Sequence, residues 1–191
     1  MTNEQKSELS EQELVHEASS GDRAAFKALY ERNRDRIYNL AFYMLGDSVW
    51  AEDALQAVFL KAYRGLAGFR FEAEFSTWLF RIALNECQNQ LRRRRGNFVP
   101  IESVLGSDED VESANLPDSE YLERQRAEII RRAVMDLTPK FRAVVMMKYF
   151  EGLSYSEIAA ILGCSPGTVA SRMNRALLKI EERLRPLKGI L

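Results

Sequence analysis

Small polar side chains and arginines alternate at helical spacing between positions 165 and 175. Ser165 and Pro166 are suited to begin a helix, whose apolar face is then formed by Val169, Met173, Ala176, Leu177 and Ile180. The other side carries Ser165, Gly167, Thr168, Ser171, Arg172, Asn174 and Arg175. Such groups bind base edges in a major groove, and arginine binds guanine or phosphate. The chemistry predicted here is recognition of duplex DNA.

A shorter helix is predicted immediately before this one. Ser154 and Glu157 have the spacing of a capping box, and Gly163 permits the left-handed turn that ends the helix. Its buried stripe is predicted to be Ile158, Ala159 and Leu162. The alternative is an ordinary helical hairpin with a solvated polar face. The combination of caps, glycine and arginines favours a helix-turn-helix. Leu178 lies on the polar face and is a candidate contact with a protein partner.

Charge is segregated along the chain although the totals nearly balance, with 27 Lys and Arg against 28 Asp and Glu. Residues 124–191 carry 13 basic and 6 acidic side chains, a net charge of +7, and residues 101–123 carry 8 acidic and no basic ones. A basic excess on a short segment indicates a polyanionic partner, whereas an acidic stretch with Gly, Pro and Ser is typical of a solvated tether.

Capping signals and apolar spacing predict helices throughout and no strand. Ser10 and Glu13 form a capping box. Further helices are predicted to run from Gly21 and Asp22 to about Leu45, from near Ser48 to the region of Gly65 to Gly68, and from Phe75 or Ser76 into Arg92–Arg95. Helices resume near Ser119 and break at Thr138, with Pro139 in the next first turn. We expect an all-α fold of two small domains, 1–95 and 121–191, joined by a flexible acidic linker, 96–120.

The third predicted helix has a mixed exposed face. Its core side is Ala51, Leu55, Val58, Phe59, Ala62 and Leu66, and the opposite side carries Val49, Asp53, Gln56, Leu60 and Arg64. Apolar and polar residues together on an exposed face indicate a protein contact surface. A solvated face with two stray apolar residues is the alternative.

The fourth predicted helix carries a narrow polar stripe, made of Thr77, Arg81, Asn85, Gln88 and Arg92. A loop with Phe69, Arg70 and Phe71 precedes it. Basic and aromatic groups in this arrangement suit contacts to a DNA backbone and stacking on unpaired bases. In the competing interpretation Phe75 and Trp78 are core residues, and the arginine cluster stabilises the helix C-terminus. We favour a core position for Trp78 and phosphate contact for the arginines.

The sequence gives little indication of a catalytic or metal-binding site. His16 is the single histidine, and Cys87 and Cys164 are expected to be buried thiols. We find no paired carboxylates, activated nucleophile or phosphate-binding loop, so an enzyme is the least favoured class and no cofactor is expected. The polar N-terminus and the lack of a long apolar run predict a cytoplasmic protein without membrane insertion.

The motifs "AEDALQAVFLKAYRGL", "FSTWLFRIALN" and "LTPKFRAVVMMKYFEGLSYSEIAAILGCSPGTVASRMNRA", with the acidic stretch between them, resemble bacterial sigma factors of the extracytoplasmic-function group. The resemblance extends from Glu11 over nearly the whole chain. It implies a factor that binds core RNA polymerase and directs it to promoters, with no small-molecule substrate. An inhibitory anti-sigma factor is a further partner that it implies.

The resemblance also implies roles for particular residues. Asp53, Gln56 and Leu60 would contact the polymerase clamp. The aromatic loop and the Arg81 stripe would hold the melted strand of the minus-ten element, and the helix-turn-helix would read the minus-thirty-five element in duplex form. Two positions depart from the family pattern: Ala57 replaces a common acid, and Ala170 replaces a common basic residue.

Two other classes of protein compete with this interpretation. A free-standing helix-turn-helix regulator would bind duplex DNA as a dimer, with the N-terminal half sensing a ligand or dimerising. A helical adaptor would have no nucleic-acid role, but the +7 segment argues against it.

Overall fold

The computed structural model describes residue 6 and residues 9–96 and 118–187. The elements are α2 (Glu11–Ser19), α3 (Arg23–Leu45), α4 (Ser48–Gly65), the 3-10 turn η1 (Leu66–Gly68), α5 (Phe75–Gly96), α6 (Asp118–Met135), α7 (Pro139–Val145), the π-helical turn η2 (Met146–Phe150), α8 (Tyr155–Leu162), α9 (Pro166–Leu184) and the 3-10 turn η3 (Arg185–Leu187). No strand occurs within these ranges, and the all-α prediction is confirmed.

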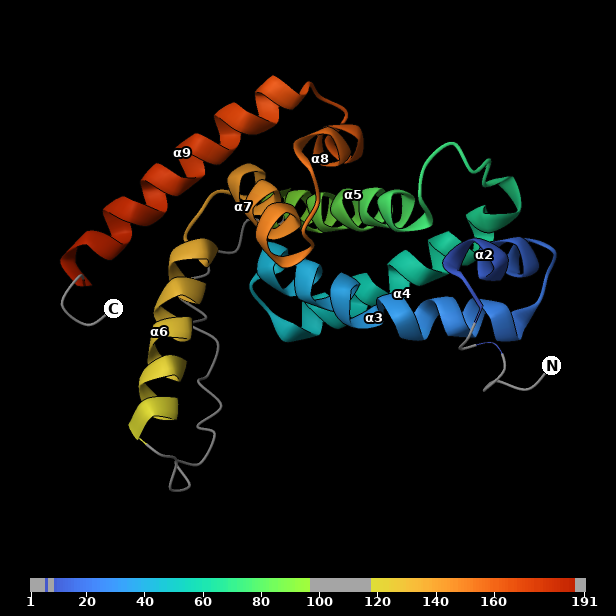
Figure 1. Ribbon diagram of the computed structural model, residues 1–191, viewed down its shortest axis with the longest axis horizontal. Coiled ribbons are helices and arrows are strands. Elements are labelled where there is room, and N and C mark those ends of the chain that lie inside the picture. Colours follow the sequence, from blue (N-terminus) through green and yellow to red (C-terminus); the bar gives the residue numbers. More distant parts are fainter. Residues whose placement is uncertain (1–5, 7–8, 97–117, 188–191) are drawn as a thin grey trace.

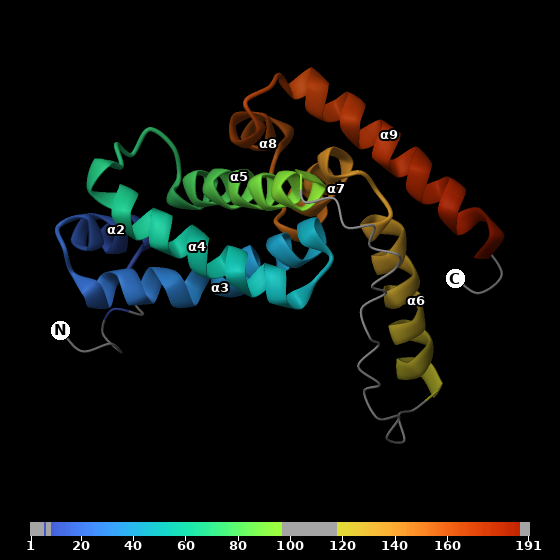
Figure 2. The ribbon, with the colours of Figure 1, turned by 180° about the vertical axis from the view of Figure 1, so that it is seen from behind.

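The helices form two groups that lie against each other (Figures 1 and 2). In the first, α3, α4 and α5 pack together and α2 covers one end of α3. In the second, α7 and α8 lie between α9 and the first group, and α6 extends away from it. The buried apolar side chains of both groups belong to one continuous cluster, from Leu14 to Ala176.

Helix bounds follow the local signals in the sequence. The Asp22 carboxylate accepts hydrogen bonds from the backbone N–H groups of Ala24 and Ala25, at 2.7 and 3.1 Å, and begins α3. Gly46 ends the same helix in the left-handed conformation, at φ 74°. Ser10 and Glu13 form the predicted capping box of α2. Thr138 precedes α7 as predicted, but its side chain makes no capping hydrogen bond.

Packing between the two groups was not predicted from the sequence. The half-buried side chain of Arg142 on α7 donates to the carbonyl oxygens of Tyr43 and Met44 at the end of α3. It also donates to the carbonyl oxygens of Met135 and Leu137, where α6 ends. The predicted linker lies largely at residues 97–117, outside the described residues, and the domain boundaries stay a prediction.

Because Asp22 is charged, part of the protein's free energy of unfolding should change with pH in the acid range. The pKa of this carboxyl is lowered from 3.8 to about 2, first by the Lys6 side chain and next by the backbone N–H of Ala25. Its stabilising effect is therefore complete above pH 3.8 and is lost as the pH falls through about 2. We expect Asp22→Asn, which keeps a capping group, to lower the free energy of unfolding at neutral pH. The further decrease in that free energy between neutral pH and pH 2 should be smaller in the variant than in the parent.

Urea unfolding followed by circular dichroism at several pH values measures this effect. The exposed Glu52 on α4 provides the control, Glu52→Gln, which should keep the parent's pH dependence. An unchanged slope for Asp22→Asn between neutral pH and pH 2 would contradict the assignment.

Candidate nucleic-acid and polymerase interfaces

The helix-turn-helix forms as predicted. The backbone N–H of Glu157 donates to Ser154 Oγ at 3.2 Å, and the backbone N–H of Ser154 donates to Glu157 Oε2 at 2.7 Å. The Ser154 hydroxyl and then the Ser154 backbone N–H, both beside the Glu157 carboxylate, lower the pKa of Glu157. Gly163 ends α8 in the left-handed region at φ 61°. Both ends of α8 are therefore fixed locally, which sets the angle at which α9 begins.

The second helix of the pair, α9, begins at a capped turn. Ser165 Oγ accepts from the backbone N–H of Thr168 at 3.2 Å, and Pro166 occupies the first turn. Val169, Met173 and Ala176 are buried as predicted. Leu177 was wrongly predicted on the core face: its side chain is 40% exposed, because it lies one residue beyond the buried stripe and next to Leu178. In α8, Leu162 is half-buried and Ile161 is buried instead.

A cationic groove of about 400 Å³ lies along the N-terminal half of α9. It is lined by Lys140, Phe141, Ser165, Gly167, Thr168, Ser171, Arg172 and Arg175. Asn174 is exposed on the same helix but does not line the groove. Sequence reasoning missed Lys140, which comes from the start of α7; its place beside the predicted cap at Thr138 was the available signal. The groove thus combines short polar side chains, which can hydrogen-bond to base edges, with three cations.

The predicted stripe on α5 is only partly accessible. Arg81, Asn85 and Arg92 are exposed and Gln88 is half-buried. Thr77 is only 7% exposed, so its prediction as a surface contact is not met in this structure. Arg81 Nη2 donates to the carbonyl oxygen of Ala160 on α8, at 2.7 Å. One end of the stripe therefore faces the second group of helices.

Part of the arginine cluster has a structural role. Arg94 Nη1 donates to the carbonyl oxygen of Leu45 at 3.2 Å, and its guanidinium lies 5.1 Å from the centre of the Trp50 ring. A cation at a helix C-terminus offsets the negative end of the dipole, here that of α3. Arg92 and Arg93 stay exposed. The helix end that Arg94 contacts is thus that of α3 and not that of its own helix, and phosphate contact by Arg92 and Arg93 stays a prediction.

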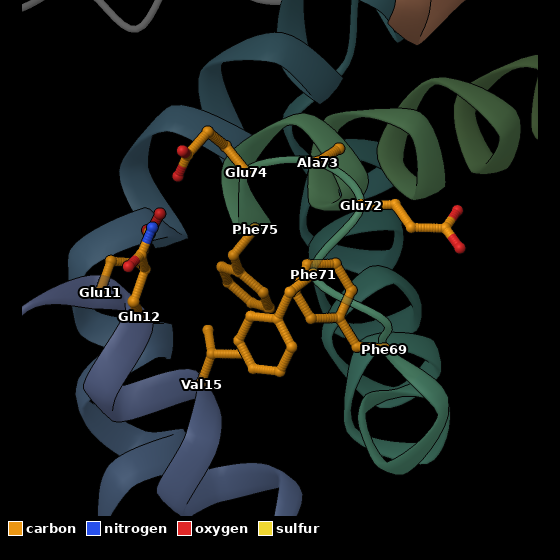
Figure 3. Close-up of a pocket in the computed structure, with 9 residues that line it drawn as sticks. All are labelled: Glu11, Gln12, Val15, Phe69, Phe71, Glu72, Ala73, Glu74 and Phe75. Atoms are coloured by element: carbon orange, nitrogen blue, oxygen red, sulfur yellow. The ribbon is translucent and has the colours of Figure 1, made fainter.

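The aromatic loop forms one wall of a cavity of about 190 Å³ (Figure 3). Phe71 has φ 56°, which is strained for a bulky residue, and its ring is 50% exposed. The Phe69 ring lies 5.0 Å from that of Phe71 and 5.1 Å from that of Trp78. Trp78 is partly buried against the core, as favoured, and Phe75 is buried.

The cavity also receives residues that sequence reasoning missed. Glu11, Gln12 and Val15 of α2 line it, and so does Glu74 from the loop. In Figure 3 the polar ends of Glu11, Gln12 and Glu74 gather on one side, opposite the aromatic rings, while Glu72 points away. Arg70 is exposed but does not line the cavity. The contribution of α2 depends on tertiary packing, which no local pattern indicates.

The outer face of α4 has the predicted mixed character. Val49 is 69% and Leu60 is 50% exposed, with Asp53, Gln56 and Arg64 exposed among them. The six predicted core residues on the other side are all buried. Trp50 and Tyr63 add two further exposed rings that were not predicted. Exposed apolar residues that follow one another along a helix indicate a contact surface for a protein.

Among the described residues we find no site for metal binding or for thiol chemistry. No group of three or more potential metal ligands occurs among the described residues. Burial raises the pKa of the Cys87 thiol to about 12, which makes it unreactive, and Cys164 is half-buried. In the part of the chain that the structure describes, no helix has the length and apolar character needed to cross a bilayer.

Two family models match the chain. Sigma-70 region 2 matches residues 29–96, and sigma-70 region 4 matches residues 127–180. The RNA polymerase sigma-H factor of Pseudomonas aeruginosa is 34% identical over 93% of this chain and 95% of its own length. The ECF RNA polymerase sigma-E factor of Haemophilus influenzae is 33% identical over 94% of this chain and 98% of its own length.

A solved structure agrees with these matches. The sigma factor RpoE of Bartonella quintana, in complex with the anti-sigma factor NepR, has a TM-score of 0.64 and 28% identity, and covers 84% of this chain and 96% of that one. The two matched regions, the order of the helices and the shared length all agree with the resemblance found in the motifs. The chain belongs to the extracytoplasmic-function group of sigma-70 family factors.

Proposed function

We propose that this sigma factor directs core RNA polymerase to promoters through three surfaces: the groove on α9, the stripe and cavity beside α5, and the outer face of α4. The observation that carries the proposal is that one chain combines a capped, cationic helix-turn-helix with an aromatic cavity suited to unpaired bases. The contribution is binding rather than catalysis, and it takes place in the cytoplasm, where the polymerase works.

The groove on α9 reads the minus-thirty-five element as duplex. Arg172 and Arg175 can each donate two hydrogen bonds to a guanine or a phosphate. Thr168 and Ser171 lie nearer the helix N-terminus, where base edges come within reach of short side chains. Lys140 adds a cation from α7 and suits a phosphate beside the groove. Gly167 and Asn174 complete this surface, and Ala170 leaves one position without a basic group.

The cavity and the α5 stripe hold the melted minus-ten strand. Extruding a base costs a few kcal/mol, which stacking on Phe71 and Phe69 offsets. The carboxylates of Glu11 and Glu74 accept hydrogen bonds and suit a base that presents an amino group. Arg70, Arg81, Asn85, Gln88 and Arg92 then follow the backbone, while the buried Thr77 supports α5 from within.

The face of α4 docks on the clamp of core polymerase through Asp53, Gln56 and Leu60. Leu60 supplies an apolar anchor, and Asp53 and Gln56 supply polar contacts at its edge. We assign this role to residues 1–95, minus-thirty-five recognition to residues 121–191, and a tether to residues 96–120. Two elements bound through one tether gain effective concentration. An anti-sigma factor, the partner named in the Bartonella complex, is the inhibitor we propose.

Run-off transcription with purified core polymerase tests the proposal. The factor should yield start-site-specific transcripts from a subset of genomic promoters. The free chain should bind duplex DNA only weakly and with strong salt dependence. If the chain instead forms a tight dimer that binds duplex sites without polymerase, and core polymerase gains no promoter specificity from it, the protein is a free-standing regulator.

We predict that Gln56→Lys weakens binding to core polymerase, because it places an unpaired cation within the α4 contact face. Gln125→Lys, at an exposed position of α6, is the matched control and should bind like the parent. Fluorescence competition for core polymerase measures both. If Gln56→Lys and the parent bind core polymerase with equal affinity, Gln56 is not part of the contact surface.

We predict that Arg172→Ala costs about 1–3 kcal/mol in binding to the preferred upstream element, through loss of a bidentate contact to guanine. Lys140→Ala should weaken binding uniformly across sequences and reduce the salt slope by about 1. Lys179→Ala, on α9 outside the groove, should change neither. Holoenzyme binding to a panel of upstream sequences distinguishes the cases, and an equal loss for Arg172→Ala on every sequence would mean phosphate contact instead.

We predict that Phe71→Ala reduces the population of open promoter complexes, because removing one stacking ring costs about 1–3 kcal/mol per base. Phe71→Tyr keeps the ring and should retain most of the activity. Permanganate reactivity of unpaired thymines on a fixed promoter measures the open fraction. Normal opening by Phe71→Ala would exclude the ring from strand capture.

A further inference from the structure

A polar side chain lies in the buried face of α3. Asn33 is only 2% exposed, and the residues one turn to either side of it, Leu29 and Ile37, are buried and apolar. Its side-chain amide donates to the carbonyl oxygen of Leu29 at 3.0 Å and to Glu11 Oε1, on α2, at 3.4 Å. A buried amide costs free energy unless it is hydrogen-bonded, and an apolar side chain of similar shape would fill this position without that cost. The contact with Glu11 is therefore what this amide contributes.

That contact holds an acid at the wall of the cavity beside the aromatic loop. Glu11 is half-buried in the first turn of α2 and lines the cavity. The other acid of this turn, Glu13, is engaged in the cap, where its Oε2 accepts from the backbone N–H of Ser10 at 2.8 Å. An ionised carboxylate has about four acceptor positions, so one hydrogen bond from Asn33 leaves the Glu11 group able to accept from a ligand.

The start of α2 is held on α3 by contacts that do not involve this amide. Arg32 Nη2 donates to the carbonyl oxygen of Leu9 at 2.6 Å, and Leu14 and Val15 of α2 are buried. These contacts anchor the helix itself, whereas Asn33 binds only the end of a side chain. Loss of the amide should therefore free the carboxylate to turn and leave the helix in place.

The cavity has the electrostatic character of a site for a base rather than for a phosphate. The described residues that line it include three glutamates and no lysine or arginine. In Figure 3 the ends of Glu11 and Glu74 lie on one side, opposite the aromatic rings. Carboxylates repel the phosphates of a strand but accept hydrogen bonds from the amino groups of cytosine and adenine. Thymine has no amino group and would bring carbonyl oxygens towards them.

We infer that Asn33 is a positioning residue for strand capture: through its hydrogen bond to Glu11 it holds a carboxylate at the cavity wall, and so favours an extruded base that carries an amino group. The inference rests on the proposed role of the cavity as the site of that base. Asn33 is buried and does not line the cavity. It acts by orientation, because a carboxylate that is already aimed loses less rotamer freedom when the base binds.

Binding of the holoenzyme to pre-melted promoter DNA tests the inference. The probes share one promoter with an unpaired non-template strand at the minus-ten element, in which each position carries in turn cytosine, adenine, thymine or an abasic site. At one position the parent should bind the cytosine or the adenine probe about tenfold more tightly than the thymine probe. If no position favours an amino base over thymine, the selection is wrong.

Asn33→Leu removes the donor at nearly constant size. It should reduce this ratio of affinities to about twofold and leave binding of the abasic probe unchanged. Glu11→Gln should also lower the ratio, and adding Asn33→Leu to it should lower the ratio no further, because the amide acts only through that carboxylate. Asn39→Leu, the same exchange at an exposed position of α3, is the matched control and should keep the parent's ratio.

Circular dichroism checks that each variant is folded. Asn33→Asp, which keeps the shape but sets a second acceptor against Glu11, replaces Asn33→Leu if that variant unfolds, and it should lower the ratio in the same way.

Three results would contradict the positioning role: a folded Asn33 variant with the parent's ratio, a loss by the same factor on every probe including the abasic one, or additive effects in the double variant. In each of them the holoenzyme still binds the melted strand, so the proposed function stands. That function fails instead if the parent yields no promoter-specific transcript.

Discussion

One half-buried arginine, which donates to carbonyl oxygens of two different helix ends, constrains how the two halves of this protein meet. Arg142 reaches the ends of both α3 and α6, where the unpaired carbonyls and the negative ends of the helix dipoles lie. Burial lowers its pKa, yet arginine remains charged at any physiological pH. A cation partly removed from water at this position favours the arrangement that supplies four carbonyl oxygens at once, and so constrains where α7 lies on α3.

The positions of α8 and α9 follow from this placement of α7. Glycine and serine caps set the angle between α8 and α9 locally, and α7 anchors the pair on α3. As a result the groove on α9 stays open, whereas α8 lies against α5. The start of the α5 stripe therefore lies beside α8, where Arg81 donates to the carbonyl oxygen of Ala160, while the groove on α9 stays open.

Local chemistry explains which parts were predictable from sequence. The bounds of α3, α8 and α9 were found because Asp22, Gly163 and Ser165 act on backbone groups only a few residues away. The buried stripes were found for the same reason except at positions such as Leu177 and Leu162, which were assigned to the core but are exposed and half-buried, respectively. Packing between distant segments was not predictable: Arg142 reads as an ordinary helical arginine. Likewise, nothing local brings Glu11 to the cavity or Arg81 to α8.

The acceptor that Arg81 finds on α8 is a main-chain oxygen, and this has an evolutionary consequence. Every amino acid supplies that oxygen, so mutational drift at position 160 leaves the acceptor in place whatever side chain arises. Natural selection could tune this bond only through the arginine itself or through the bulk of the residue at 160. Lineages that diverge in sequence along α8 would thereby inherit the same acceptor.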